Sequence, residues 1–143
     1  MAERPAAPAY VLDAYACMAY LADEPGRVEV EGVLRAATAG QARVLTCWVN
    51  VVEVYYLALR RRGRAVADSA LSVLRHLPLS LVLPDEQLCL TAAELKGLHP
   101  VSLADAFAAA LAITSGAELL TGDPDFAHLS PMLRVLWLSG PSS

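Results

Sequence analysis

Short apolar runs alternate with longer segments of helical character along this chain of 143 residues. The runs that we expect to form buried strands cover residues 9–12, 43–47, 79–83, 118–121 and 134–138. The segments that we expect to be helical cover residues 14–21, 29–39, 50–62, 65–77, 85–98 and 103–115. Strands that alternate with helices in this way predict a parallel sheet with right-handed crossovers and helices on both faces. The sequence therefore predicts an α/β fold.

Residues that favour helix ends support these boundaries. Asn50, Asp85 and Ser102 stand where three of the helices are expected to begin, and their side chains can accept hydrogen bonds from the first free backbone N–H groups. Gly63 and Gly116 stand where two helices are expected to end.

Composition fits one domain with an apolar interior. The chain has about the length of one domain, and 56% of its residues are hydrophobic while 18% are charged, which suits a sheet that is covered on both faces. We expect a single domain over residues 1–143, with flexible ends at 1–8 and 139–143. The longest apolar stretch, 101–120, contains charged residues, and the N-terminus lacks a signal-peptide core, so we expect a cytoplasmic protein with no membrane partner.

The cysteines indicate neither disulfides nor zinc. Cys17, Cys47 and Cys89 are odd in number, widely spaced and set among apolar neighbours, without other ligands at zinc spacing. We expect all three to be reduced core residues.

Acidic residues stand at the ends of several predicted elements. Asp13 follows the first strand, Glu53 and Asp105 fall in the first turns of two helices, and Asp123 follows the fourth strand. Because ligands bind beyond the carboxyl ends of parallel strands, acids from distant parts of the chain can converge there. Hard cations prefer oxygen ligands, so convergence would create a site for Mg²⁺ or Mn²⁺.

Each acid also has a purely structural explanation. Asp13 is a good helix cap, and Glu53 and Asp105 stand at capping-box spacing from Asn50 and Ser102. The segment Gly-Asp-Pro-Asp that contains Asp123 is ordinary turn chemistry. The combination favours the metal site, because like charges gathered at one edge raise one another's pKa unless a cation bridges them.

The motifs, in this order and spacing, resemble those of PIN domains, and more narrowly those of the VapC-type toxins of toxin-antitoxin pairs. The resemblance runs from Tyr10 to Trp137 and rests on the segments Tyr10-Val-Leu-Asp13, Asn50-Val-Val-Glu53, Ser102-Leu-Ala-Asp105-Ala106 and Thr121-Gly-Asp123-Pro-Asp125-Phe126. One position departs from the pattern: the family often has a small hydroxyl residue two places after the first Asp, where this chain has Tyr15.

The resemblance implies a three-layer α/β/α sandwich with a central parallel sheet and a metal-dependent endoribonuclease activity. It implies that the catalytic, metal-binding acids are Asp13, Glu53, Asp105 and Asp123, with Thr121, Asp125 and Asn50 in supporting places. The carboxylates would hold one or two Mg²⁺ or Mn²⁺ ions that position a water for attack on an RNA phosphodiester. It further implies the toxin of a type II toxin-antitoxin system, with a cognate antitoxin and a homodimeric state.

The charge pattern leaves the RNA interface open. A net charge of −4 argues against broad nucleic-acid binding, which depends on many contacts between basic side chains and phosphates, but not against a nuclease. The basic cluster consists of Arg60, Arg61, Arg62 and Arg64. These residues could contact RNA phosphates, or they could simply complement the dipole at a helix C-terminus.

Two other functions compete with the ribonuclease. One is a catalytically weak PIN-fold module for RNA binding or assembly, which the intact acids disfavour. The other is a phosphatase or phosphoacceptor with Asp13 as nucleophile. The phosphatase pattern requires a second Asp where Tyr15 stands, and Lys96, the sole lysine, precedes the third acid instead of following it. Glycine-rich nucleotide-binding motifs are absent from the sequence.

Overall fold

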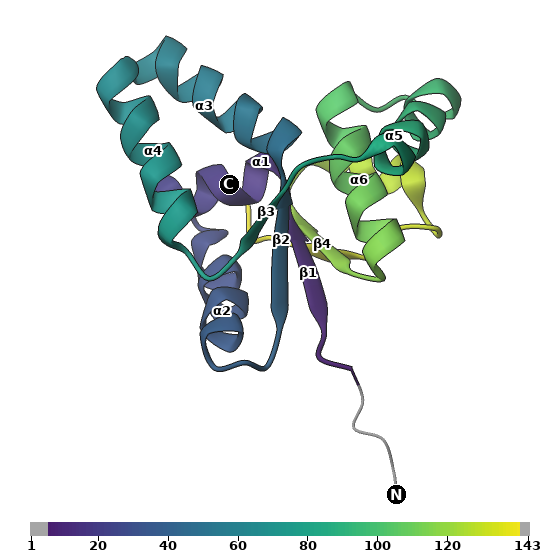
Figure 1. Ribbon diagram of the computed structural model, residues 1–143, viewed down its shortest axis with the longest axis horizontal. Coiled ribbons are helices and arrows are strands. Elements are labelled where there is room, and N and C mark those ends of the chain that lie inside the picture. Colours follow the sequence, from purple (N-terminus) through teal and green to yellow (C-terminus); the bar gives the residue numbers. More distant parts are fainter. Residues whose placement is uncertain (1–5, 141–143) are drawn as a thin grey trace, which may run out of the picture.

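The computed structural model describes residues 6–140. Five parallel strands in the order β3-β2-β1-β4-β5 lie between two layers of helices (Figure 1). The strands are β1 (Ala9–Leu12), β2 (Arg43–Cys47), β3 (Ser80–Val82), β4 (Glu118–Thr121) and β5 (Val135–Trp137). The helices are α1 (Ala14–Leu21), α2 (Arg27–Thr38), α3 (Trp48–Arg62), α4 (Arg64–His76), α5 (Glu86–Leu98), α6 (Leu103–Ser115) and the 3-10 helix η1 (Pro124–Leu129). The predicted α/β/α sandwich with a parallel sheet is confirmed.

The direction in which the chain adds strands to the sheet reverses at β1. The chain adds β2 and then β3 on one side of β1, and returns through α5 and α6 to place β4 on the other side. Open parallel sheets bind ligands beyond the strand ends at such a switch point. Asp13 directly follows β1 and Asp123 follows β4 by two residues, so the topology places both acids there.

Each face of the sheet has its own core, and the two-residue period of the strands separates them. Leu12 and Leu120 pack with α1 to α4, whereas Val11 and Leu119 pack with α5, α6 and η1. Figure 1 shows the same division, with α1 to α4 on one side of the sheet and α5 and α6 on the other.

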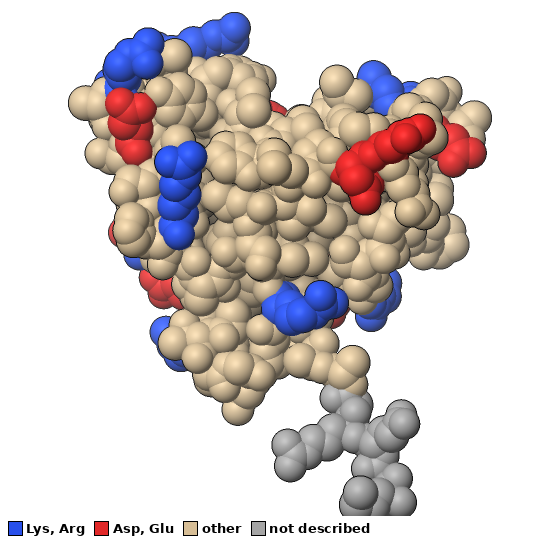
Figure 2. All heavy atoms as spheres, viewed as in Figure 1, with Lys and Arg blue, Asp and Glu red and all other residues tan. Residues whose placement is uncertain are grey.

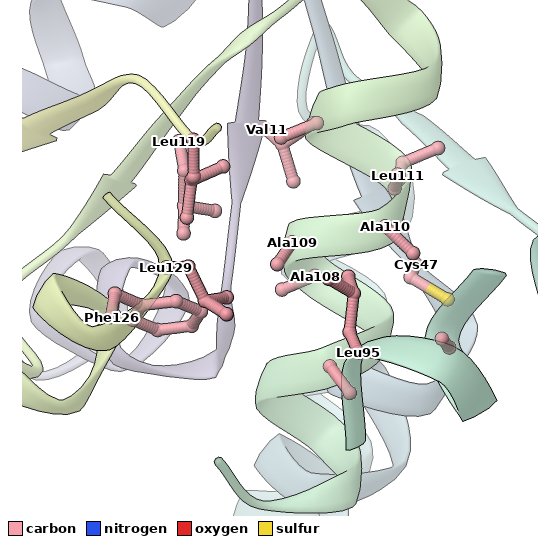
Figure 3. Close-up of a cluster of buried hydrophobic side chains, with 14 of the residues drawn as sticks. Val11, Cys47, Leu95, Ala108, Ala109, Ala110, Leu111, Leu119, Phe126 and Leu129 are labelled. Carbon is pink, nitrogen blue, oxygen red and sulfur yellow. The ribbon is translucent and has the colours of Figure 1, made fainter. Parts of the chain in front are cut away.

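Small side chains on α6 bring this helix close to the sheet. Ala106, Ala108, Ala109 and Ala112 are fully buried. Phe126 of η1 is also fully buried, and Figure 3 shows it beside Leu129, facing the alanines of α6. Burying a side chain of this size stabilises the fold by about 1.5–3 kcal/mol. This packing anchors η1, which begins directly after Asp123.

Several boundaries differ from those predicted. α3 begins at Trp48, so Asn50 lies inside the first turn and is not the cap. α2 begins at Arg27 instead of residue 29, and η1 was not expected from the sequence. A capping side chain at Asn50 was a wrong prediction because the backbone turns helical immediately after β2, before a capping residue is reached.

The prediction for Cys89 is wrong, whereas Cys17 and Cys47 are buried free thiols as expected. Cys89 is exposed because α5 buries Leu88, Ala92 and Leu95, and the next position after Leu88 points about a quarter of a turn away from that face.

Part of the C-terminal tail expected to be flexible is held in place. Ser139 donates from its backbone N–H and from its hydroxyl to Glu29 of α2. Residues 1–5 and 141–143 of the predicted flexible ends lie outside the described residues. In the described range, no helix combines the length and apolarity needed to cross a bilayer.

Candidate active site

The four acids singled out in the sequence line one pocket at the carboxyl edge of the sheet. The pocket has a volume of about 270 Å³ and receives Asp13 after β1, Glu53 from α3, Asp105 from α6 and Asp123 after β4. Its other lining residues are Ala14, Tyr15, Met18, Glu24, Leu57 and Arg61. Figure 1 shows α3 and α6 beginning at the edge where the strands end, which is why their N-terminal parts reach this place.

Asp13 caps a helix and belongs to the pocket at the same time. Its side chain is only 1% exposed. Oδ1 accepts a hydrogen bond from the N–H of Ala16 at 2.8 Å, and Oδ2 accepts one from the Thr121 hydroxyl at 2.5 Å. Asp13 can therefore cap α1 through Oδ1 and take part in the acidic site through Oδ2.

Thr121 connects two of the acids. Its hydroxyl donates to Asp13 and accepts a hydrogen bond from the backbone N–H of Asp123 at 3.0 Å. Since Thr121 is fully buried, its hydroxyl is committed to these two partners. Thr121 thus fixes the turn after β4 relative to the end of β1.

Asn50 connects the two helices that carry the remaining acids. Its side-chain amide donates to the carbonyl of Ala104 at 3.1 Å, the residue before Asp105. Oδ1 of Asn50 is buried and has no hydrogen-bond partner among the described residues. The capping-box explanation for Glu53 is wrong, because α3 starts two residues before Asn50 and Glu53 lies beyond its first turn.

Three carboxylates, those of Asp105, Asp123 and Asp125, lie close together. Oxygen atoms of these three side chains all lie within 4.8 Å of one another. The N–H of Asp105 donates to Ser102 Oγ at 3.1 Å, and the N–H of Asp125 donates to Asp123 Oδ1 at 2.9 Å. The capping pattern predicted at Ser102 is thus present and leaves the Asp105 carboxylate directed to the cluster.

Burial and mutual repulsion raise the pKa values of three acids of this site. Burial raises the pKa of Asp13 to about 7, opposed by the hydrogen bonds from Thr121 and Ala16 and assisted by the charges of Asp105 and Asp123. Burial and the charge of Asp123 raise the pKa of Asp105 to about 6. The same two causes raise the pKa of Glu53.

The arrangement fits a divalent cation. Three carboxylates within reach of one ion supply the oxygen ligands that Mg²⁺ and Mn²⁺ prefer, and Asp13 and Glu53 stand on the wall of the same pocket. A bound cation would also favour the ionised forms of all of these groups and so relieve their repulsion.

The four arginines of the basic cluster have different surroundings. Arg61 lines the acidic pocket, whereas the guanidinium of Arg60 lies 5.0 Å from the centre of the Tyr56 ring. Arg62 and Arg64 are not among the residues that line this pocket in the described part of the chain. Figure 2 shows basic side chains at the outer end of the lobe formed by α3 and α4.

A signal for Arg61 was present in the sequence. Glu53, Leu57 and Arg61 follow one another at intervals of four residues, which places them on one face of a helix, and all three line the pocket. Glu24 had no comparable signal, because it comes from the turn after α1.

Tyr15 also lines the pocket, and its ring packs against the turn after β4. A Cβ atom at Gly122 would lie 2.3 Å from ring atoms of Tyr15, far inside van der Waals contact. With the Tyr15 ring in this position, a larger residue at position 122 would force the ring to move.

Comparisons with known proteins agree with this geometry. The PIN domain family matches residues 10–130. No curated protein sequence matches the chain. The chain is similar in structure to the VapBC2 complex of Rickettsia felis bound to a promoter DNA fragment, with a TM-score of 0.73, 18% identity and coverage of 92% of this chain and 99% of that one.

Two further structures show the same similarity. The DNA-bound VapBC complex of Salmonella typhimurium has a TM-score of 0.68 and 21% identity, and covers 90% of this chain and 97% of that one. VapC20 of Mycobacterium tuberculosis, a toxin that cleaves the sarcin-ricin loop, has a TM-score of 0.66 and 20% identity, and covers 85% of this chain and 95% of that one. At these identities the likeness shows a common fold.

Proposed function

Because the chain belongs to the PIN domain family, we propose that it is a metal-dependent endoribonuclease and the toxin of a type II toxin-antitoxin system. The observation that carries the proposal is the convergence of acids from four separate elements on one pocket. The proposed substrate is cellular RNA, and the proposed place of action is the cytoplasm.

The chain's own residues would bind and orient the reactants. Asp105, Asp123 and Asp125 would hold Mg²⁺ or Mn²⁺ together with Asp13 and Glu53. When bound, the ion supplies the positive charge that activates a water and stabilises the negative charge developing on the phosphodiester. No side chain needs to act as a covalent nucleophile. Through its hydrogen bonds, Thr121 fixes the positions of Asp13 and Asp123 relative to each other.

Arg61 is the basic residue best placed to contact the substrate. It is a cation on the wall of a pocket otherwise rich in carboxylates, and a guanidinium can donate two parallel hydrogen bonds to a phosphate. We assign it to the RNA phosphate next to the cleaved bond.

RNA cleavage by the purified protein tests the proposal. We expect single-stranded RNA to be cut in the presence of Mg²⁺ or Mn²⁺, and cutting to stop with a chelator or with Asp105→Asn or Asp13→Asn. Asp85→Asn is the matched control, because it changes an acid at the start of α5 that does not line the acidic pocket, and Asn still caps a helix. RNA cleavage that survives both active-site substitutions would contradict the proposal.

The same assay separates the alternative functions. A catalytically weak RNA-binding module would bind RNA without cutting it under any metal condition. A phosphatase or phosphoacceptor using Asp13 is disfavoured by geometry, since that carboxylate is 1% exposed and both of its oxygens accept hydrogen bonds.

A partner protein and self-association complete the proposal. Exposed apolar side chains stand on α3 and α4 at helical spacing, namely Val52, Tyr56, Val66 and Val73. Such surfaces commonly receive an amphipathic partner helix or a second copy of the chain. Co-expression with a cognate antitoxin should yield a complex that no longer cuts RNA; a chain that remains active and alone would contradict the toxin assignment.

A further inference from the structure

A second pocket adjoins the acidic one and shares two residues with it. This neighbouring pocket has a volume of about 260 Å³ and is lined by Tyr15, Glu24, Pro25, Gly26 and Ser139. Tyr15 and Glu24 line both pockets. A ligand that occupies the acidic pocket and continues along the surface therefore meets the Tyr15 ring at the boundary.

The walls of the neighbouring pocket are held together by contacts from distant parts of the chain. Ser139 donates to Glu29 through its N–H and its hydroxyl, which fixes the segment after β5 against α2. Gly26 lets Leu138 lie close to the start of α2, because a Cβ at position 26 would lie 3.0 Å from the Cβ of Leu138. Tyr15 is in turn fixed against Gly122. The pocket is thus a built feature of the fold.

The groups that line this neighbouring pocket suit a nucleobase. The pocket offers an aromatic ring, a carboxylate that accepts hydrogen bonds, and a hydroxyl. Aromatic rings stack with nucleobases, and carboxylates accept hydrogen bonds from exocyclic amino groups of bases. A phosphate would be repelled by Glu24, so the backbone of a nucleic acid does not suit this pocket but a base does.

We propose that this neighbouring pocket binds the nucleobase next to the cleaved phosphodiester and selects a base with an exocyclic amino group over uracil. The inference rests on the proposed ribonuclease function and assigns Glu24 as the residue that determines the base preference and Tyr15 as a residue that binds the base. Tyr15 supplies the stacking surface, and Glu24 accepts the hydrogen bond that uracil cannot donate.

Cleavage of matched oligonucleotides tests the proposal. Substrates identical except for one base beside the cleaved bond should differ, with the wild type favouring adenine, cytosine or guanine over uracil by roughly ten-fold in kcat/KM. Glu24→Ala should reduce that ratio to within about two-fold, and Glu94→Ala on α5 should leave it unchanged. Because the readout is a ratio, a general loss of activity does not imitate it.

Substitutions at Tyr15 separate stacking from the hydroxyl group. Tyr15→Phe should retain the base preference, whereas Tyr15→Leu should raise KM for all substrates by roughly ten-fold because stacking is tolerant of base identity. An unchanged preference in Glu24→Ala would overturn the proposal. So would variants that cut RNA normally but resist inhibition by the partner protein, because the pocket would then be a partner contact.

A binding measurement decides the matter even if the protein cuts no RNA. Titration with AMP, CMP and UMP, followed by NMR, should shift the backbone amide signals of Gly26 and Ser139 with AMP and CMP more than with UMP. Glu24→Ala should abolish that difference. Absence of any shift would overturn the pocket assignment while leaving the ribonuclease proposal standing. Selective shifts in a protein that cuts no RNA would overturn the ribonuclease proposal while leaving the assignment of a base-binding pocket standing.

Discussion

One hydroxyl, that of Thr121, serves two acids of the site. It donates to Asp13 Oδ2 and accepts from the N–H of Asp123, although Asp13 lies 108 residues away along the chain. The hydrogen bond to Asp13 stabilises the ionised carboxylate and so opposes the burial that raises the pKa of this acid to about 7. The Thr121 hydroxyl thus favours the ionised form of the most deeply buried of the four acids.

Thr121→Val should make the site harder to ionise. Without the hydroxyl, the pKa of Asp13 rises further, so the acidic limb of the pH–rate profile should move to higher pH and cleavage at neutral pH should fall roughly ten- to a hundred-fold. The free energy of unfolding should fall by about 1–3 kcal/mol. The measurements are pH–rate profiles and urea denaturation.

Thr114→Val is the control for this substitution, because that hydroxyl bonds only to carbonyls of its own helix α6. Equal shifts of the pH profile in both variants would show that Thr121 has no special role.

At the scale of elements, the sequence predicted which segments are helices and strands but not how they contact one another. The alternation of apolar runs with helical periods identified the elements of the sheet and its parallel connections. It did not show that Asn50 binds the carbonyl of Ala104 across 54 residues, or that Tyr15 packs on Gly122. These contacts depend on the distance between packed elements, which periodicity does not contain.

Two of the three capping residues predicted from the sequence cap a helix in the structure, and the third does not. Ser102 and Asp85 cap their helices as predicted, because each side chain reaches the N–H three residues on. Asn50 fails as a cap because α3 begins at Trp48. Asp125 was given only a supporting place, yet its carboxylate lies within the closest acidic cluster, since η1 folds it back toward Asp123.

Asn50→Ala should loosen the attachment of α3 to α6. The carbonyl of Ala104 loses its donor in a partly buried position, so the free energy of unfolding should fall by about 1–3 kcal/mol. Glu53 and Asp105 lie on these two helices, and affinity for Mn²⁺ should fall with their misalignment. Calorimetric titration checks the affinity and thermal unfolding checks the stability. A variant that is less stable but binds Mn²⁺ like the wild type would exclude the positioning role.

For the whole molecule, the raised pKa values make stability depend on pH. The pKa of Asp13 is about 7 in the folded protein and near its ordinary value of 3.8 when unfolded. Between these values the folded state binds more protons than the unfolded state, so stability is greatest at the acidic end of the window and falls as pH rises through 7. Asp105, with a pKa of about 6, contributes in the same direction.

Thermal unfolding of the protein with a chelator should therefore give a Tm that is about 5 °C or more higher at pH 5.5 than at pH 8. Addition of Mn²⁺ at pH 8 should raise Tm progressively with concentration, because the ion binds the folded state. Asp105→Asn should weaken both effects, since it removes one of the repelling charges and one of the ligands. A metal-free Tm that rises steadily from pH 5.5 to pH 8 would contradict the assigned burial of these acids.

Titration of Mn²⁺ into the metal-free protein tests the central claim most directly, since the claim is that acids from separate elements form one cation site. The wild type and Asp85→Asn should bind Mn²⁺ with the same affinity, and Asp105→Asn should bind at least about ten-fold more weakly. If the wild type binds no Mn²⁺, or if Asp105→Asn binds it as tightly as the wild type does, the acids do not form the proposed site.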